Sequence, residues 1–317
     1  MWQDANRIEV IVISVNQETP LVKKFTLARE DGEALPGFSS GSHITTYING
    51  LERNYSLTNY QDQGNCYEIA IRLNDCSAGG SSYWHQHVKA GYKLKISYPK
   101  NHFPLSFKAK HHVFYAAGIG ITPFLSMMAE LKDALGSFEL HFAAKSKEMC
   151  AFYGLIKEKY RDQSHFYFSE EIDSERLGVS SLLEHRIGTH VYFCGPELFI
   201  SDFTDAAMQY GYPRSSIHHE RFTPPLPKEK KPFLAELTNG KSVHVSMEKT
   251  LLEALLEEGI KIPYSCKVGC CGTCELKVEE GEIAHFDSFL SEEQKNKHNV
   301  ILACVSRAKS EKLVLVL

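Results

Sequence analysis

The stretch that says most about this chain is Cys266-Lys-Val-Gly-Cys-Cys-Gly-Thr-Cys274. With Cys304 it gives the spacing Cys266-x4-Cys271-x2-Cys274-x29-Cys304. A [2Fe-2S] cluster takes four thiolates, two on each iron, and this spacing supplies them. The glycines of the loop let backbone N–H groups approach the sulfides. The spacing therefore predicts a [2Fe-2S] centre with four ligands: Cys266, Cys271, Cys274 and Cys304.

A zinc site is the alternative for these thiols. Zinc modules usually bring their ligands as two close couples, whereas here three thiols share one loop and the fourth is far along the chain. Five of the nine cysteines lie between Cys266 and Cys304. In a reducing compartment such a cluster indicates metal binding rather than disulfides. Cys270 is expected to be a small non-ligand residue beside the cluster, and an exchange of ligand between Cys270 and Cys271 is the less favoured alternative.

The residues around this loop predict a small module over 233–317. Strands are expected at Phe233–Leu237 and Ser242–Ser246, joined at the turn dipeptide Asn239-Gly240. A helix is expected over Thr250–Glu258, because Thr250 and Glu253 form a capping box and Gly259 can end it. Before the module, four of the ten residues 223–232 are proline, which predicts an extended linker.

Two further patterns precede the linker. The first ~105 residues hold short alternating runs separated by glycine and Asn/Asp clusters, which predicts a β barrel or sandwich. The expected strands are Val10–Val15, Lys24–Ala28, His43–Ile48, Tyr67–Leu73 and Lys93–Ser97. From ~110 to 222 strands alternate with helices, which indicates a parallel sheet. The expected strands are Val113–Ala117, Phe138–Ala143, His165–Phe168 and His190–Cys194, and a helix is expected from Thr122, as N-cap, to about Leu135.

Two motifs of the barrel segment carry part of the family resemblance given below, and it is that resemblance that implies flavin binding. In Arg53-Asn-Tyr55-Ser56-Leu57, an aromatic ring can stack on the isoalloxazine, a hydroxyl can hydrogen-bond its N5, and a guanidinium can pair with phosphate. Taken alone, this motif is better explained as an ordinary strand end. In Gly79-Gly80-Ser81-Ser82, backbone N–H groups before a helix expected at Tyr83–Val88 can hold an anion.

The second segment holds a dinucleotide-type turn. Gly118-Ile-Gly120-Ile-Thr122-Pro123 follows a strand and opens a helix, although Pro123 replaces the third glycine of the general pattern. Tyr192-Phe-Cys194-Gly195-Pro196 ends another strand, before a helix at Glu197. Without that motif, Cys194 would be taken for a small buried thiol.

With these motifs in this order, the whole chain resembles the phthalate dioxygenase reductase family, which includes the reductases of vanillate demethylase and carnitine monooxygenase. The resemblance implies a multidomain α+β fold. Its parts are an antiparallel β-barrel flavin domain at 1–107, an α/β nicotinamide-binding domain of the ferredoxin-reductase type at 108–222, a linker at 223–232, and a C-terminal plant-type [2Fe-2S] ferredoxin (β-grasp) domain at 233–317.

The resemblance also assigns roles by position. Tyr67–Arg72 resembles the strand beside the flavin, and His219-Glu220-Arg221-Phe222 resembles the segment that ends the nucleotide domain, where Phe222 would cover the flavin. Catalytic roles are implied for Ser56, Thr122, Cys194, Glu220 and Phe222. Cofactor contacts are implied for Arg53, Tyr55, Ser56, Leu57, Arg72, Gly79, Gly80, Ser81, Ser82, Gly118, Gly120, Thr122, Pro123, Cys194, Gly195, Pro196 and Phe222.

FMN is expected rather than FAD, and NADH rather than NADPH, both from the resemblance. The residues themselves do not decide between NADH and NADPH, because Lys145 and Lys147 could hold a 2′-phosphate. The implied activity passes electrons from NADH through FMN and [2Fe-2S] to a Rieske-type oxygenase component of a carnitine- or vanillate-type system. A separate ferredoxin or a diiron hydroxylase is an alternative acceptor, and a redox sensor without turnover is an alternative of a different class.

Composition limits the other classes of function. The 317 residues are 43% apolar and 23% charged, which excludes a disordered chain and predicts two or three folded domains. The net charge is -4 and no long basic run occurs, so nucleic acid is not expected as a partner. No apolar run approaches the ~20 residues of a membrane helix. Because Met1–Asn6 also lacks a secretion signal, we expect a cytoplasmic protein.

Overall fold

The computed structural model describes residues 7–60, 65–74, 79–172, 174–225 and 230–317. The chain divides into two compact units, Met1–Arg221 and Phe222–Leu317. The expected linker at 223–232 lies partly outside the described residues, and the predicted domain boundaries stay a prediction. In the described residues, no helix has the length and apolar character that crossing a membrane requires.

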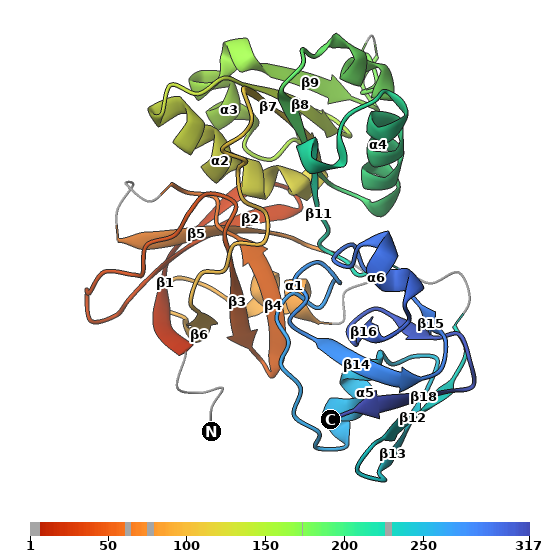
Figure 1. Ribbon diagram of the computed structural model, residues 1–317. Coiled ribbons are helices and arrows are strands. Elements are labelled where there is room, and N and C mark those ends of the chain that lie inside the picture. The colour runs from red at the N-terminus through yellow and green to blue at the C-terminus, as the bar shows by residue number, and fades with distance from the viewer. Residues whose placement is uncertain (1–6, 61–64, 75–78, 173, 226–229) are drawn as a thin grey trace. The chain divides into compact units, whose positions relative to one another are not determined.

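The first part of unit one is a six-stranded antiparallel sheet with the order β4-β3-β6-β1-β2-β5 (Figure 1). Its edge strands meet, because Leu57 bridges Ile69 and the Thr58 amide donates to the Glu68 carbonyl over 2.8 Å. This closure confirms the expected barrel. The strands are β1 (Arg7–Thr19), β2 (Val22–Ala28), β3 (His43–Ile48), β4 (Leu51–Ser56), β5 (Cys66–Arg72) and β6 (Lys93–Ser97).

Alternation builds the barrel core. Along β1, Ile8, Val10 and Val12 are buried, and Glu9 between them is exposed. The helix α1 (Gly80–His87) places the fully buried Trp84 in the same core. Two predictions were wrong here. Strand β4 was not expected, and α1 begins three residues before the predicted Tyr83, so the glycine and serine residues lie within its first turn.

The second part of unit one is a parallel sheet with the order β11-β10-β7-β8-β9. Val113 and Tyr115 of β7 pack toward α4, whereas Phe114 packs in the cluster that holds α2 and α3, so helices cover both faces (Figure 1). The elements are β7 (His111–Ala117), α2 (Thr122–Asp133), β8 (Phe138–Ala144), α3 (Tyr153–Lys159), β9 (Ser164–Phe168), β10 (Thr189–Cys194), α4 (Glu197–Gln209) and β11 (Ile217–Glu220).

The start of α2 differs from the prediction. A 3-10 turn at Gly118–Ile121 runs directly into the helix, so Ile121 takes the N-cap position and Thr122 is already helical. Pro123 stands in the first turn as expected. The helix ends at Asp133, two residues short of Leu135, which is 94% exposed and has a φ of 53°.

The barrel and the parallel sheet contact each other within unit one. The Gly41 amide donates to Ser126 Oγ over 3.1 Å, and a Cβ at Gly41 would lie 2.2 Å from the Phe103 carbonyl oxygen. Phe103 packs against Phe124 and Tyr192 of the α/β part, with ring centroids 5.9 and 5.8 Å apart. These contacts fix the barrel against α2.

Unit two is a five-stranded mixed sheet with the order β13-β12-β18-β14-β16, plus the pair β15-β17. The capping box of Thr250 and Glu253, the left-handed Gly259 (φ 74°) and the hairpin turn at Asn239-Gly240 are all confirmed. The elements are β12 (Phe233–Leu237), β13 (Ser242–Val245), α5 (Leu251–Glu257), β14 (Glu275–Glu280), β15 (Ile283–Ala284), α6 (Glu292–Asn296), β16 (Val300–Leu302), β17 (Arg307–Ala308) and β18 (Lys312–Val316).

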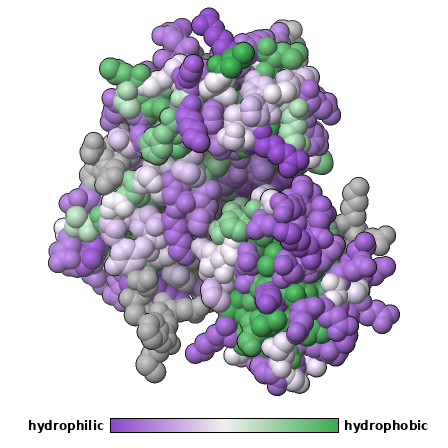
Figure 2. Space-filling view, in the orientation of Figure 1, coloured by the Kyte–Doolittle hydropathy of each residue, from purple (hydrophilic) through white to green (hydrophobic). Residues whose placement is uncertain are grey.

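On the face that Figure 2 shows, the surface of each unit is mainly hydrophilic, and apolar side chains gather on part of unit two. The large exposed hydrophobic residues of that unit are Phe222, Met247, Phe289, Val316 and Leu317.

Candidate redox sites

The first candidate site lies where the order of the parallel sheet reverses. β7 lies between β8, which follows it in sequence, and β10, so the crevice at the carboxyl ends of β7 and β10 is the topological switch point. Ligands of doubly wound sheets bind there. The turn Gly118–Ile121 follows β7, and Gly195-Pro196 follows β10, so the structure brings the two predicted nucleotide motifs to one edge.

Two glycines allow these motifs to touch. A Cβ at Gly120 would lie 2.1 Å from the carbonyl oxygen of Cys194, far inside contact distance. A Cβ at Gly195 would lie 2.9 Å from that of Ala117. Both positions therefore require glycine because the backbones approach so closely.

Thr122 has a structural partner at this edge. Its side chain is buried, and its Oγ1 donates to the Ile119 carbonyl over 3.0 Å. The hydroxyl therefore closes the 3-10 turn that precedes the helix. The predicted contact of Thr122 with the nucleotide stays a prediction.

Three of the predicted catalytic residues converge beside this edge. Cys194 and Glu220 are register partners at the last positions of β10 and β11. The hydroxyl of Ser56, at the end of β4, donates a hydrogen bond to the Glu220 carboxylate. Ser56 is 5% exposed and Cys194 is fully buried. The convergence joins the barrel to the parallel sheet.

Burial changes the acid–base properties of these groups. Loss of solvation raises the pKa of Glu220 from 4.5 to about 8, although the Ser56 hydrogen bond opposes the rise. Burial and the nearby Glu220 raise the pKa of Cys194 well above its ordinary value. Glu220 Oε2 is buried and accepts no hydrogen bond within the described part of the chain. A polar group brought by a ligand can satisfy this oxygen.

The Glu220→Gln variant should lose a pH dependence of stability. Because the folded-state pKa of about 8 exceeds 4.5, the folded protein keeps a proton that the unfolded chain has lost. The contribution of Glu220 to the free energy of unfolding should therefore fall as the pH rises from about 5 to 8, by at most ~1.4 kcal/mol per pH unit. Histidines such as His218 and His219, whose pKa burial lowers to about 4, contribute in the opposite sense below pH ~6.5. Urea unfolding followed by Trp84 fluorescence will measure the pH slope of the total. Glu220→Gln should make this slope more positive and the exposed Glu158→Gln should not; equal slopes in all three proteins would contradict the assignment.

A possible anion site lies at the start of α1. Gly79 has a φ of 90°, and α1 begins without a side-chain cap. A Cβ at Gly80 would lie 2.9 Å from Arg53 Nε, so the guanidinium rests against the first turn of the helix. Helix N–H groups and a guanidinium together suit a phosphate. The structure thus brings together two motifs that the sequence only suggested separately.

The other predicted flavin residues lie around this position. The Tyr55 ring meets Trp84 edge-on, with centroids 5.8 Å apart, and Leu57 is fully buried. Ser81 Oγ accepts from the Asn74 amide over 3.1 Å. Arg72 is exposed at the end of β5. Ser82 is half-buried within α1.

Phe222 is the remaining predicted catalytic residue. It is the first residue of unit two and is 42% exposed. Its expected role in covering the flavin stays a prediction.

The second candidate site is the cysteine loop of unit two. The thiols of Cys270, Cys271 and Cys304 lie close enough to Cys266 to hold its pKa below the ordinary value. Cys304 acts in the same way on the pKa of Cys274. The four predicted ligands therefore converge, and Cys270 lies beside them. Cys266, Cys274 and Cys304 are at most 6% exposed.

The loop fits a cluster in its backbone as well. The Val268 amide donates to Cys266 Sγ over 3.4 Å, the kind of N–H···S contact that iron–sulfur sites use. Gly269 and Gly272 have φ of 77° and 73°. A Cβ at Gly272 would lie 2.4 Å from the Phe289 ring, so an aromatic side chain covers this part of the loop.

Comparison with known proteins relates both units to known families. Residues 236–309 match the family described as 2Fe-2S iron-sulfur cluster binding domain, and residues 95–217 match the N-terminal domain of dimethylamine monooxygenase subunit DmmA-like proteins. The carnitine monooxygenase reductase subunit of Acinetobacter baumannii is 36% identical over 308 residues, 96% of each chain. The vanillate O-demethylase oxidoreductase of Acinetobacter baylyi is 37% identical, over 97% of this chain and 98% of that one.

A solved structure matches this chain over almost its whole length. Phthalate dioxygenase reductase, described as a modular structure for electron transfer from pyridine nucleotides to [2Fe-2S], is 30% identical with a TM-score of 0.79, over 99% of each chain. The chain belongs to the phthalate dioxygenase reductase family. As a member of this family it is an oxidoreductase whose unit two is a [2Fe-2S] domain, and the predicted multidomain fold is confirmed. The same match favours the iron–sulfur interpretation over zinc.

The names of the relatives differ in the system that they point to. The heme-dependent oxidative N-demethylase beta subunit of Ectopseudomonas mendocina is 36% identical, over 97% of this chain and 98% of that one. Membership of the phthalate dioxygenase reductase family therefore defines an oxidoreductase, and the acceptor of its electrons is a separate question.

Sequence reasoning missed an ion pair that positions Glu220. Arg221 Nε lies 2.8 Å from Glu197 Oε2 and 3.1 Å from Oε1, and its Nη1 lies 2.9 Å from His219 Nε2. The pair ties the end of β11 to the start of α4, the helix that follows β10. Arg221 belongs to the motif at 219–222 in the sequence, but only the fold shows that Glu197 is its partner.

Proposed function

We propose that this chain oxidises NADH and passes the electrons through FMN and a [2Fe-2S] cluster to a Rieske-type oxygenase component. The observation that carries the proposal is the convergence of Ser56, Cys194 and Glu220 at the switch point, in a chain that also brings four cysteine thiols together. In this proposal residues 1–107 bind the flavin, 108–222 the nucleotide and 233–317 the cluster.

A bound flavin accepts two electrons together and releases them singly, which neither nicotinamide nor the cluster does. Residues of this chain supply its placement. Arg53 and the first turn of α1 would hold a phosphate, and Ser56 would hydrogen-bond the ring edge. Glu220 is neutral at pH 7, because its pKa is about 8, so it can donate as well as accept a hydrogen bond. The buried Cys194 would exclude water from the nicotinamide.

FMN and NADH are the cofactors that we favour. For FMN the support is the resemblance to the phthalate dioxygenase reductase family. For NADH it is the two carboxylates, Glu170 and Glu171, which follow β9 and contact the loop after β8, as the next section describes. Free thiols that ligate iron suit a reducing compartment, so we place the protein in the cytoplasm.

A haem-containing demethylase is the second candidate for the acceptor, because one relative of nearly full length is named as a subunit of a heme-dependent enzyme. Reduction of a panel of purified acceptors will separate the candidates. A Rieske oxygenase should be reduced faster than a haem protein, a ferredoxin or a diiron hydroxylase; a faster haem protein would replace the first candidate.

An anaerobic NADH titration followed by the visible spectrum tests the proposed path. Two electrons on the flavin and one on the cluster need about 1.5 equivalents of NADH. Absorption of both groups should bleach as that amount is added. If only the flavin bleached, the cluster would not be in electronic contact with it. If neither bleached, the protein would be a sensor rather than a reductase.

A further inference from the structure

The loop after β8 lies where a doubly wound sheet meets the ribose of a dinucleotide. β8 is the neighbour of β7, whose following turn is the proposed pyrophosphate site. In such sheets, residues after the second strand contact the adenosine ribose and distinguish a free 2′-hydroxyl from a 2′-phosphate. Residues 145–152 are therefore placed to determine the choice between NADH and NADPH.

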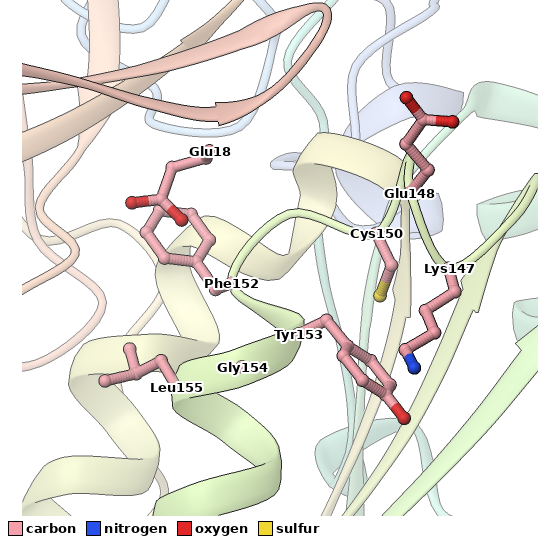
Figure 3. A pocket seen from close by; sticks show the side chains of 8 residues that line it. All are labelled: Glu18, Lys147, Glu148, Cys150, Phe152, Tyr153, Gly154 and Leu155. Carbon is pink, nitrogen blue, oxygen red and sulfur yellow. The ribbon is translucent and has the colours of Figure 1, made fainter.

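Two lysines of this loop could attract a 2′-phosphate, but both have partners. Lys145 Nζ lies 3.0 Å from Glu170 Oε1. Lys147 Nζ lies 5.1 Å from the centroid of the Tyr153 ring, close enough for a cation–π contact. In Figure 3 the Lys147 and Tyr153 side chains extend in the same direction. Both line a cavity of about 510 Å³, which Glu148 and Cys150 also line.

Two carboxylates are held against the same loop. Glu170 and Glu171 follow β9, and the Glu170 amide donates to the Lys145 carbonyl over 2.8 Å. The Ser169 amide likewise donates to the Ala144 carbonyl over 3.0 Å. Glu171 Oε1 accepts a hydrogen bond from the backbone N–H of Lys147. The loop amide that could bind a phosphate is therefore already bonded to a carboxylate.

We propose that Glu170 and Glu171 exclude the 2′-phosphate and make the enzyme selective for NADH. The inference rests on the proposed function. A 2′-phosphate would bring about two negative charges next to two carboxylates and would compete with them for Lys145 and the Lys147 amide. The carboxylate of Glu170 is 60% exposed, so salt should weaken the discrimination.

Binding of two nucleotide fragments to the full-length holoprotein tests the proposal. Isothermal titration should show that 5′-AMP binds more tightly than 2′,5′-ADP. The double variant Glu170→Gln, Glu171→Gln should bind 2′,5′-ADP about tenfold more tightly and 5′-AMP within about twofold of the original protein. The kcat/KM for NADPH should rise by a similar factor, and the difference between variant and original protein should shrink at high ionic strength.

A matched control comes from the opposite end of β9. Glu158→Gln with Asp162→Asn removes the same charge from exposed positions before that strand and should leave both affinities unchanged. The inference is overturned if the original protein binds 2′,5′-ADP as tightly as 5′-AMP, if the double variant gains nothing, or if the control gains equally. Each of these three results is compatible with reduction of the protein by NADH, so the proposed function would stand. If NADH fails to reduce it and neither fragment binds, the proposed function itself fails.

Discussion

Cys274→Ser should remove the iron–sulfur cluster and leave the NADH-oxidising part of the protein working. Cys274 is 2% exposed, and the nearby thiol of Cys304 lowers its pKa. A serine hydroxyl replaces the soft thiolate poorly, so less than about a tenth of the iron should remain. Reduction of the flavin by NADH should stay within about twofold of the original rate, because Met1–Arg221 is an independent compact unit. Stopped-flow absorbance and iron analysis measure the two effects.

Cys270→Ser is the matched control for this variant. Cys270 lies in the same loop and its thiol faces Cys266, but the spacing assigns the ligand position to Cys271. This variant should keep its iron and reduce the acceptor at a normal rate. Loss of the cluster in Cys270→Ser would show that Cys270 is a ligand. Loss of flavin reduction in Cys274→Ser would show that the two units do not function independently.

Local signals in the sequence predicted unit two closely. The capping box at Thr250, the left-handed glycine at 259 and the turn at Asn239-Gly240 each act within a few residues, so their physical cause is contained in the sequence around them. The cysteine spacing is also largely a local signal. Three of the four ligands lie in nine residues, and only the position of Cys304 depends on the fold.

The errors occurred where local preference competes with distant contacts. Leu51–Ser56 has no apolar alternation, and it becomes β4 because it pairs with β3. Thr122 is a good N-cap by residue type, yet the preceding 3-10 turn moves the cap to Ile121. The sequence could not predict the acid–base chemistry of the site either. Ser56 and Glu220 belong to different sheets, so their hydrogen bond and the raised pKa of Glu220 follow only from the packing of those sheets.

Gly120→Ala should disable the nucleotide site by moving its backbone. The new Cβ would lie 2.1 Å from the Cys194 carbonyl oxygen and 2.7 Å from the Gly195 amide nitrogen, and neither backbone atom can rotate away. The two loops must separate, at a cost of about 1–3 kcal/mol for overpacking. Displacement of the nicotinamide-binding edge by ~1 Å should lower kcat/KM for NADH about 100-fold.

Gly178→Ala separates this steric effect from the general effect of losing a glycine. Gly178 is exposed with a φ of -106°, and a Cβ there would lie 3.4 Å from Ser180 Oγ, an ordinary contact distance. Alanine at this position should keep or slightly raise stability and leave kcat/KM for NADH unchanged. Flavin content and dithionite reduction of Gly120→Ala should also stay normal, because its barrel is unaltered. A Gly120→Ala protein with normal kcat/KM would mean that the contact between the two loops does not shape the nucleotide site.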